Sequence, residues 1–190
     1  MTALLAALLL LAPGDVAVTV DAIGIGNSWR PGDVTAMHVT VTSALPAPQA
    51  SWIQWEVPDA DGDIVEYGRP ITLAPGRATA TWLWAPTRTT DDHQTIWILR
   101  VRSFGDGVGG EDLAIQPVEP ATISTNLIDG SEGLIAVLGT RRMGLDAFQP
   151  SGVVLTQGEA SRIVSGLDAE DIPDLWPALG PLQALIWADA

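Results

Sequence analysis

The 190-residue chain contains no cysteine and no lysine, and its nine basic residues are all arginines. Without cysteine it can form no disulfide, no thiolate zinc site and no cysteine nucleophile. Only 17% of the residues are charged, with 23 acidic against 9 basic side chains and a net charge of −14 at pH 7. Because such a chain repels phosphate backbones and anionic lipid surfaces, we expect no nucleic-acid partner.

Catalytic signatures are also missing. No Gly-x-Ser-x-Gly motif occurs, and the two histidines, His38 and His93, lie in contexts that indicate neither a catalytic triad nor a zinc site. Gly24-Ile25-Gly26 lacks the helix that follows the glycines of a dinucleotide fingerprint, because Arg30-Pro31 interrupts that context. We therefore expect neither enzyme activity nor a cofactor in this chain.

The N-terminus carries an apolar run of ten residues, Ala3 to Ala12. It is too short for a bilayer span of about 20 residues, but it has the length of the apolar region of a secretory signal peptide. Only Met1 and Thr2 precede it, so the basic part of such a signal is missing. We interpret residues 1–14 as a signal peptide and expect an exported protein of the periplasm or cell envelope, which could be membrane-associated at full length. A buried N-terminal helix is the alternative.

The stretch from Ser51 to Phe104 is typical of an antiparallel β-sandwich. Alternating apolar runs are separated by turn residues such as Asp61-Gly62 and Pro75-Gly76, and five of the eight tryptophans lie here. Seven short strands between residues 15 and 120 predict an immunoglobulin-like sandwich. They are expected at Asp15–Ile25, Val34–Thr42, Ala50–Val57, Ile64–Tyr67 (resuming at Pro70–Leu73), Ala78–Ala85, Thr95–Ser103 and Leu113–Val118.

The tryptophans allow two interpretations. Trp82 and Trp84 share one face of their strand with Ala78 and Ala80, which favours a position in the core or at an intersheet contact. Rings exposed on a sandwich surface would instead stack on sugars. That alternative predicts at least two exposed, coplanar rings among Trp29, Trp52, Trp55, Trp82, Trp84 and Trp97.

After Pro120 the pattern changes. Leu134–Leu138 and Ala184–Trp187 are continuously apolar, as expected for strands that are covered on both faces. The segment between them predicts a short helix at Leu145–Phe148, strands at Val153–Leu155 and Arg162–Val164, and a helix around Pro173–Leu179, capped by Asp168, with Leu175, Trp176 and Leu179 inward. Residues 121–190 are thus predicted to begin an α/β (Rossmann-like) domain that is too short to be complete.

Two clusters are candidate binding sites. Gly139, Thr140, Arg141 and Arg142 follow a buried strand, where a loop that binds phosphate or an oxyanion is often placed, although glycine there can serve turn geometry alone. Asp59, Asp61 and Asp63 are a weak metal candidate. Their spacing lacks the glycine and glutamate positions of a calcium-binding EF-hand loop, and a hairpin turn explains them without an ion.

The order of these parts resembles one family. A short leader, a sandwich with GNSWRPGD and WEVPDADGDIVEYGR, and an α/β unit that ends in DLWPALGPLQALIW resemble large bacterial envelope proteins with an immunoglobulin-like domain before a class I glutamine-amidotransferase-like domain. The resemblance implies that strand-end loops of the second domain form its pocket. A cysteine nucleophile of a true amidotransferase would lie on a later strand, beyond Ala190, so no catalytic residue carries over to this chain.

We therefore expect a non-catalytic envelope module with a structural or protein-interaction role, whose partners are other envelope proteins or glycans. One alternative is a carbohydrate-binding sandwich that uses exposed tryptophans. The other is the N-terminal fragment of an amidotransferase-like protein whose functional site lies beyond residue 190. This last hypothesis predicts parallel pairing of Leu134–Leu138 with Ala184–Trp187 and an unpaired outer edge of the sheet.

Overall fold

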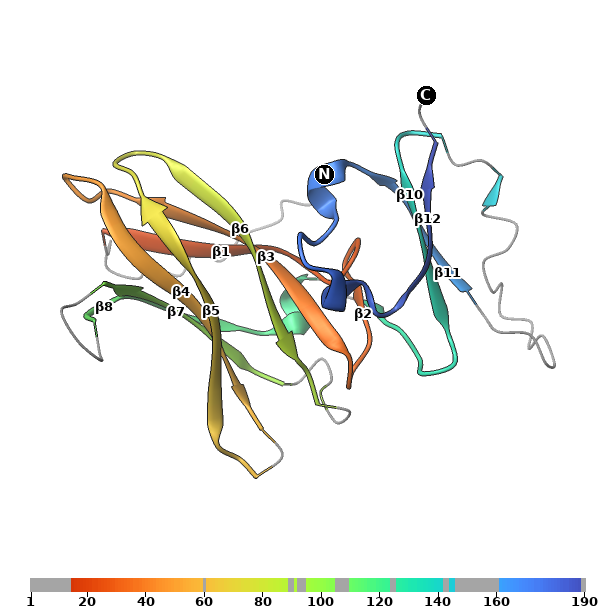
Figure 1. The fold of residues 1–190 in the computed structure, drawn as a ribbon, viewed down its shortest axis with the longest axis horizontal. Coiled ribbons are helices and arrows are strands. Elements are labelled where there is room, and N and C mark those ends of the chain that lie inside the picture. The colour runs from red at the N-terminus through yellow and green to blue at the C-terminus, as the bar shows by residue number, and fades with distance from the viewer. Residues whose placement is uncertain are drawn as a thin grey trace, which may run out of the picture.

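The computed structural model describes residues 15–59, 61–88, 91, 95–104, 110–123, 126–141, 144–145 and 161–188. The predicted signal peptide, His93, Arg142, the strand at Val153–Leu155 and most of the short helix at Leu145–Phe148 lie outside them. Over the described ranges the chain is mainly β, and no helix has the length and apolar character needed to cross a membrane. A larger body formed by β1 to β8 stands beside a smaller sheet formed by β10, β11 and β12 (Figure 1).

The larger body is an antiparallel β-sandwich, as predicted. In its first sheet the central strand is β3 (Val34–Ser43), which pairs with β1 (Val16–Ile23) and β6 (Ala78–Pro86). The second sheet has the order β5 (Ile64–Leu73), β4 (Gln49–Pro58), β7 (Trp97–Ser103), β8 (Asp112–Val118). Local alternation and turn residues place all seven strands within a few residues of the predicted bounds.

The sandwich core is centred on three tryptophans. Trp29, Trp55 and Trp97 are almost completely buried, and Trp97 makes edge-to-face contacts with the other two at centroid distances of 5.2 and 4.8 Å. Such contacts contribute roughly 0.5–1.5 kcal/mol each beyond the burial of apolar area. Strands of both sheets supply the surrounding aliphatic side chains, so one continuous core joins the sheets.

Strand β5 is longer than predicted. It continues through Pro70, which lies opposite Trp52 in the register with β4. The interruption expected before Pro70 is therefore wrong. Because β5 is the edge strand of its sheet, a residue without a backbone N–H can be placed there without loss of a ladder hydrogen bond.

The smaller sheet is parallel. Its central strand β10 (Gly133–Leu138) pairs with β11 (Ser161–Leu167) on one side and with β12 (Leu182–Trp187) on the other. The predicted parallel pairing of Leu134–Leu138 with Ala184–Trp187 is confirmed. The interpretation of Ala184–Trp187 as a strand covered on both faces is wrong. Burial alternates along β12, and Leu185 and Trp187 are 50% and 71% exposed.

The short helix predicted around Pro173–Leu179 is confirmed only in part, because Asp168 caps a 3-10 turn and no α-helix is described there. Two short 3-10 turns replace it, η3 (Ala169–Asp171) and η4 (Trp176–Leu179). Pro177 lacks the N–H that an α-helix would bond to the carbonyl of Pro173, and its ring would clash with that carbonyl. Trp176 consequently points to solvent and is 81% exposed, while Ala178 is buried in its place. No α-helix is described on the parallel sheet, so the α/β character predicted for it is not shown in this part of the chain.

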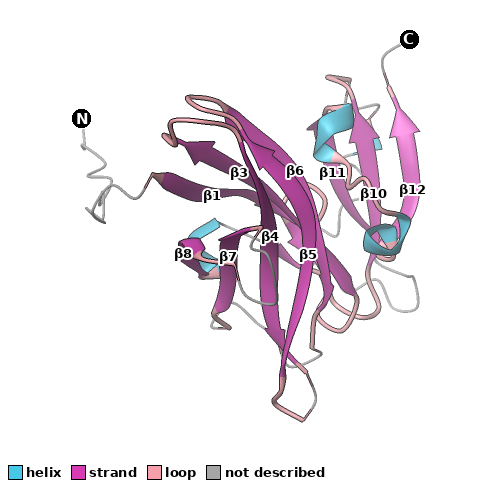
Figure 2. Ribbon diagram, turned by 60° about the vertical axis from the view of Figure 1, so that its left-hand side comes forward, coloured by secondary structure: helices cyan, strands magenta, loops and turns pink. Residues whose placement is uncertain are grey.

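The two bodies are joined by direct contacts. Strand β2 (Ser28–Trp29) pairs with β9 (Asn126–Leu127), which follows the 3-10 turn η1 (Pro120–Ile123) between the bodies. The turns η3 and η4 lie on the side of the parallel sheet that faces the sandwich (Figure 2). There the Trp82 indole N–H donates to the Glu170 carbonyl at 3.2 Å, and the Arg69 guanidinium bonds Asp174 at 2.6 Å.

Candidate functional site

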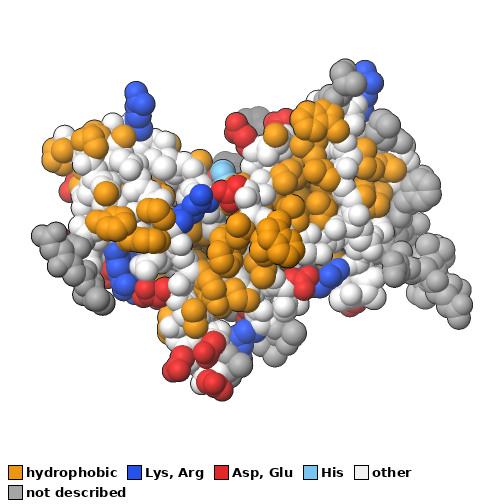
Figure 3. Space-filling model, in the orientation of Figure 1, with side chains coloured by type: hydrophobic (Ala, Val, Ile, Leu, Met, Phe, Trp, Pro, Cys, Tyr) orange, Lys and Arg blue, Asp and Glu red, His pale blue; other side chains and the backbone are white. Residues whose placement is uncertain are grey.

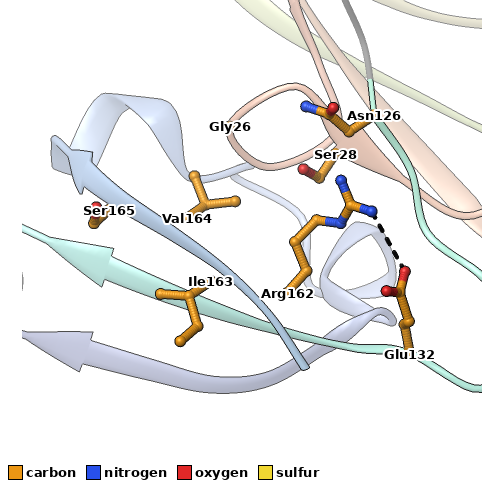
Figure 4. Close-up of a pocket in the computed structure, with 8 residues that line it drawn as sticks. All are labelled: Gly26, Ser28, Asn126, Glu132, Arg162, Ile163, Val164 and Ser165. Carbon is orange, nitrogen blue, oxygen red and sulfur yellow. Dashed lines mark ion pairs between the residues drawn. The ribbon is translucent and has the colours of Figure 1, made fainter. Parts of the chain in front are cut away.

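A cavity of about 450 Å³ lies at the junction between the sandwich and the parallel sheet. Its wall combines the loop before β2, the segment from β9 to the start of β10, and β11 (Figure 4). The polar side chains that line it belong to Ser28, Asn126, Glu132, Arg162 and Ser165. This volume lies within the range of small-molecule sites, about 300–1,000 Å³.

The sandwich wall of the cavity is formed by a tight loop after β1. Gly24, Gly26 and Asn27 all have positive φ, and a bridge between Ile25 and Ser28 closes the loop. A Cβ on Gly26 would lie 2.1 Å from Cγ1 of Val164 on β11. Glycine at this position is therefore what allows the loop to touch the parallel sheet and to hold Ser28 in the cavity wall.

The opposite wall depends on the turn before β10. The Asp129 carboxylate accepts hydrogen bonds from the backbone N–H and the hydroxyl of Ser131, and both bonds lower the pKa of Asp129. The Asp129 N–H in turn donates to Oε2 of Glu132 at 3.2 Å, and the Arg30 guanidinium donates to the Glu132 carbonyl. This turn fixes the Glu132 carboxylate beside Arg162.

Two polar groups of the cavity have no hydrogen-bond partner among the residues that the structure describes. Arg162 contacts Glu132 only through an ion pair, with Nη2 at 3.5 Å from Oε2, and its Nε is buried without an acceptor. The Ser28 hydroxyl is also buried and unbonded, in a residue that is 2% exposed. In Figure 4 both side chains extend into the space between β11 and the Ser28 loop. An unbonded buried donor or acceptor costs about 1–3 kcal/mol, so these groups favour a bound acceptor.

The arginines on the outer face of the second sheet have a different environment. Arg100 donates to Glu56 and Asp112, and Arg102 donates to Asp112 at 2.9 Å and to Glu66 at 3.1 Å. Partial burial raises the pKa of Asp112, but the hydrogen bonds from the two arginines outweigh it and leave that pKa below its ordinary value. The same bonds, chiefly that to Glu56, raise the pKa of Arg100. In this ion-pair ladder each arginine is paired with two carboxylates, whereas Arg162 is paired with one among the described residues.

The predicted glycine loop lies at the other end of the parallel sheet. Gly139 follows β10 with φ +98°, and its N–H donates to the Leu167 carbonyl at 2.8 Å, so glycine serves the turn there. Thr140 and Arg141 are exposed, and none of these three residues lines the junction cavity. Anion binding by Gly139, Thr140, Arg141 and Arg142 stays a prediction.

The interpretation of Trp82 and Trp84 as residues of the core or of an intersheet contact is confirmed for Trp82, which is buried, and is wrong for Trp84. The sandwich core takes the opposite face of β6, through Leu83 and Ala85. Trp82 is buried outside that core, against Ala36 and Ala178, while Trp84 is 39% exposed on the same outer face. Alternation shows which residues share a face, but either face of a strand can be covered once a second body packs on it.

The sandwich tryptophans do not form the flat pair that a sugar platform requires. Of the six candidates only Trp52 and Trp84 are exposed, at 37% and 39%. Trp52 lies on the outer face of the second sheet beside Phe104, and Trp84 lies on the outer face of the first sheet. The two rings therefore face opposite sides of the sandwich and cannot contact one sugar together.

The aspartates of the β4–β5 hairpin are engaged in its turn. The Asp59 carboxylate accepts the backbone N–H groups of Asp61 and Asp63, both at 2.9 Å, and Gly62 adopts φ +90°. Among the described residues no group of three or more histidine, aspartate or glutamate side chains is placed to hold a metal ion. His38 contacts Asp21 at 3.2 Å and packs on the Trp82 ring.

No protein-family model and no curated protein matches the chain. Solved structures with a partly similar fold include the Pseudomonas fluorescens alkylpurine DNA glycosylase AlkC bound to DNA containing an abasic site analog (TM-score 0.34, 17% identity, 56% of this chain, 30% of that chain). A beta-glucuronidase from glycoside hydrolase family 2 matches with TM-score 0.34 and 7% identity over 55% of this chain and 11% of that chain. The CARDB domain of the PF1109 protein from Pyrococcus furiosus matches with TM-score 0.31 and 12% identity over 55% of this chain and 87% of that domain. This chain thus spans less than a third of the first two proteins, and no family follows from these likenesses.

The sequence did not point to the cavity. Ser28 lies in the loop GNSWRPGD, and Glu132 lies in an ordinary turn before β10. The single available signal was Arg162, a charged residue inside the otherwise uncharged strand SRIVSGL. A lone arginine in such a strand indicates either a solvent-facing side chain or a site, and only the packing of three distant segments distinguishes them.

Proposed function

We propose that this chain is a non-catalytic protein-interaction module of an exported envelope protein, and that it docks a partner segment on strand β12. The observation that carries the proposal is the chemistry of that strand. It has a paired neighbour, β10, on one side and no described strand on the other. Its sequence, LQALIW, contains no charge and no proline, the two devices that usually protect an edge from pairing.

Apolar side chains extend this surface. Leu185 and Trp187 project from β12, and Trp176 on η4 is 81% exposed, more than any other large hydrophobic side chain that the structure describes. Figure 3 shows hydrophobic side chains gathered on the half of the molecule that carries β12. In strand addition, main-chain hydrogen bonds supply affinity and alternate side chains supply specificity, and this arrangement supports both.

Charge defines the partner. The segment between β11 and β12 carries four exposed carboxylates, Asp168, Glu170, Asp171 and Asp174, and the chain has a net charge of −14. A second copy of the chain would bring the same charge to the surface. The segment that suits β12 is therefore extended, apolar on one side and basic on the other.

A synthetic peptide of alternating valine and lysine tests the proposal. We expect it to slow amide hydrogen exchange over 182–187, because added ladder bonds protect an edge strand. The change Trp187→Lys should abolish this protection through lost apolar contact and added repulsion. Ile64→Lys on another edge strand, β5, is the matched control and should have no effect. Unchanged exchange over 182–187, or sedimentation as a β12-dependent homodimer, would refute the proposal.

The parallel sheet supports a second proposal, that it belongs to an α/β, amidotransferase-like domain behind an immunoglobulin-like sandwich. Its central strand, β10, pairs in parallel with β11 on one side and with β12 on the other. The chain therefore adds β11 at one edge of the sheet and then crosses to add β12 at the opposite edge. Such a reversal is how doubly wound sheets begin. Binding of the peptide to β12 would argue against this second proposal, because a larger α/β domain would place a further strand of its own at that edge.

A further inference from the structure

The junction cavity holds two buried polar groups without a partner among the described residues, Arg162 Nε and the Ser28 hydroxyl. A guanidinium carries five N–H groups, and the Nε of Arg162 is buried without an acceptor among the described residues. The Ser28 hydroxyl lies in the same wall, and Asn126 adds an amide. We propose that this cavity binds a small monocarboxylate that also carries a hydroxyl or ammonium group.

The carboxylate is assigned by the guanidinium. The planar fork of an arginine matches a carboxylate with two parallel hydrogen bonds, and a charged pair of this kind is about twice as strong as a neutral hydrogen bond. The Arg162 side chain is one third exposed, so one side of the group remains accessible to a ligand from the cavity. Its ion pair with Glu132, at 3.5 Å, is too long to saturate it.

The second group of the ligand is assigned by Glu132. This carboxylate is 17% exposed, and it faces the same cavity with acceptor capacity beyond the bond from the Asp129 N–H. It repels a doubly charged phosphate and accepts from a hydroxyl or an ammonium group. A hydroxy acid, an amino acid and a sugar acid share this chemistry, and each fits within about 450 Å³.

The site is built by the docking of the two bodies. Ser28 comes from the sandwich, Asn126 from the connecting segment and Arg162 from the parallel sheet. A ligand held by all three would stabilise the junction, because it binds the docked arrangement and not the separated bodies. This cavity is lined by no residue of the β12 surface, so either proposal can fail while the other stands.

The test uses NMR titration of the isotope-labelled protein with D-galacturonate, L-lactate and L-alanine. Acetate, which lacks the second group, and inorganic phosphate are the comparison probes. We expect at least one of the three to give saturable shifts at the amides of Gly26, Ser28 and 163–165, with acetate at least about tenfold weaker and phosphate without effect. Which probe is preferred distinguishes a sugar acid from a hydroxy acid and an amino acid.

Variants connect the binding to the residues. Arg162→Gln should weaken binding by at least about tenfold, and Glu132→Gln should raise the relative affinity for acetate and phosphate. Arg77→Gln removes the same charge at an exposed position outside the cavity and should change nothing. Ser28→Ala, which keeps the backbone pairing of β2, provides a second variant should Arg162→Gln not fold. The absence of saturable shifts with every probe, or equal binding by wild type and both Arg162→Gln and Ser28→Ala, would overturn the proposal.

Discussion

The sandwich and the parallel sheet differ in how they bury their apolar side chains and pair their arginines. The sandwich buries three tryptophans in one core and pairs the arginines of its second sheet with carboxylates. The parallel sheet divides its apolar residues between two small clusters, and it carries Leu185, Trp187 and the unbonded donors of Arg162. The largest apolar core therefore lies in the sandwich, whereas the parallel half has only small clusters beside the exposed side chains of β12.

The largest effect is expected in the sandwich core. Trp97→Ala removes a side chain that is completely buried and contacts two other tryptophans, so it should lower the free energy of unfolding by about 3–5 kcal/mol. Trp176→Ala, the same change at an 81% exposed position, should change it by no more than about 0.5 kcal/mol. Urea unfolding followed by circular dichroism measures both. Similar losses from the two variants would contradict the contrast between the two halves.

An intermediate effect is expected at the contact between the halves. Trp82→Phe removes the indole N–H that donates to the Glu170 carbonyl and replaces the two-ring indole by a single phenyl ring. We expect it to lower the free energy of unfolding by about 1–2 kcal/mol. Because Trp82 lies outside the sandwich core, we expect faster amide exchange over 169–187 and little change in β4 and β7.

Trp84→Phe is the control for this contact. It makes the same change two residues away on the same face, where the ring is 39% exposed. It should leave exchange over 169–187 unchanged. If Trp82→Phe instead loosened the core strands first, the two halves would unfold as one unit.

Sequence reasoning succeeded where the signal is local. The strands of the sandwich follow from alternation and from turn residues such as Asp61-Gly62, and Ile53, Trp55 and Val57 face the core as their alternation predicts. The strand Leu134–Leu138 and its parallel partner were predictable from continuous apolar runs.

It failed where burial depends on segments that are distant in sequence. Trp82 is covered by a turn 88 residues further along the chain, and the cavity needs Ser28 and Arg162, whose proximity no local pattern encodes. Ala184–Trp187 has the composition of a covered strand but lies at an edge of its sheet. Hydrophobicity indicates that a strand can be covered, whereas neighbours decide whether it is covered.

The smallest effect is expected in the ion-pair ladder. The pKa of Asp112 is lower in the folded protein than its ordinary value of about 3.9. The ionised carboxylate therefore stabilises the fold above that pH. This contribution is lost as the pH falls through the pKa of the folded state. Asp112→Asn should therefore lower the melting temperature slightly at pH 6–7 and have progressively less effect below about pH 4. The side chain is 38% exposed, so screening by about 1 M salt should reduce even this difference. A difference between wild type and variant that grows on acidification would contradict the ladder as its source.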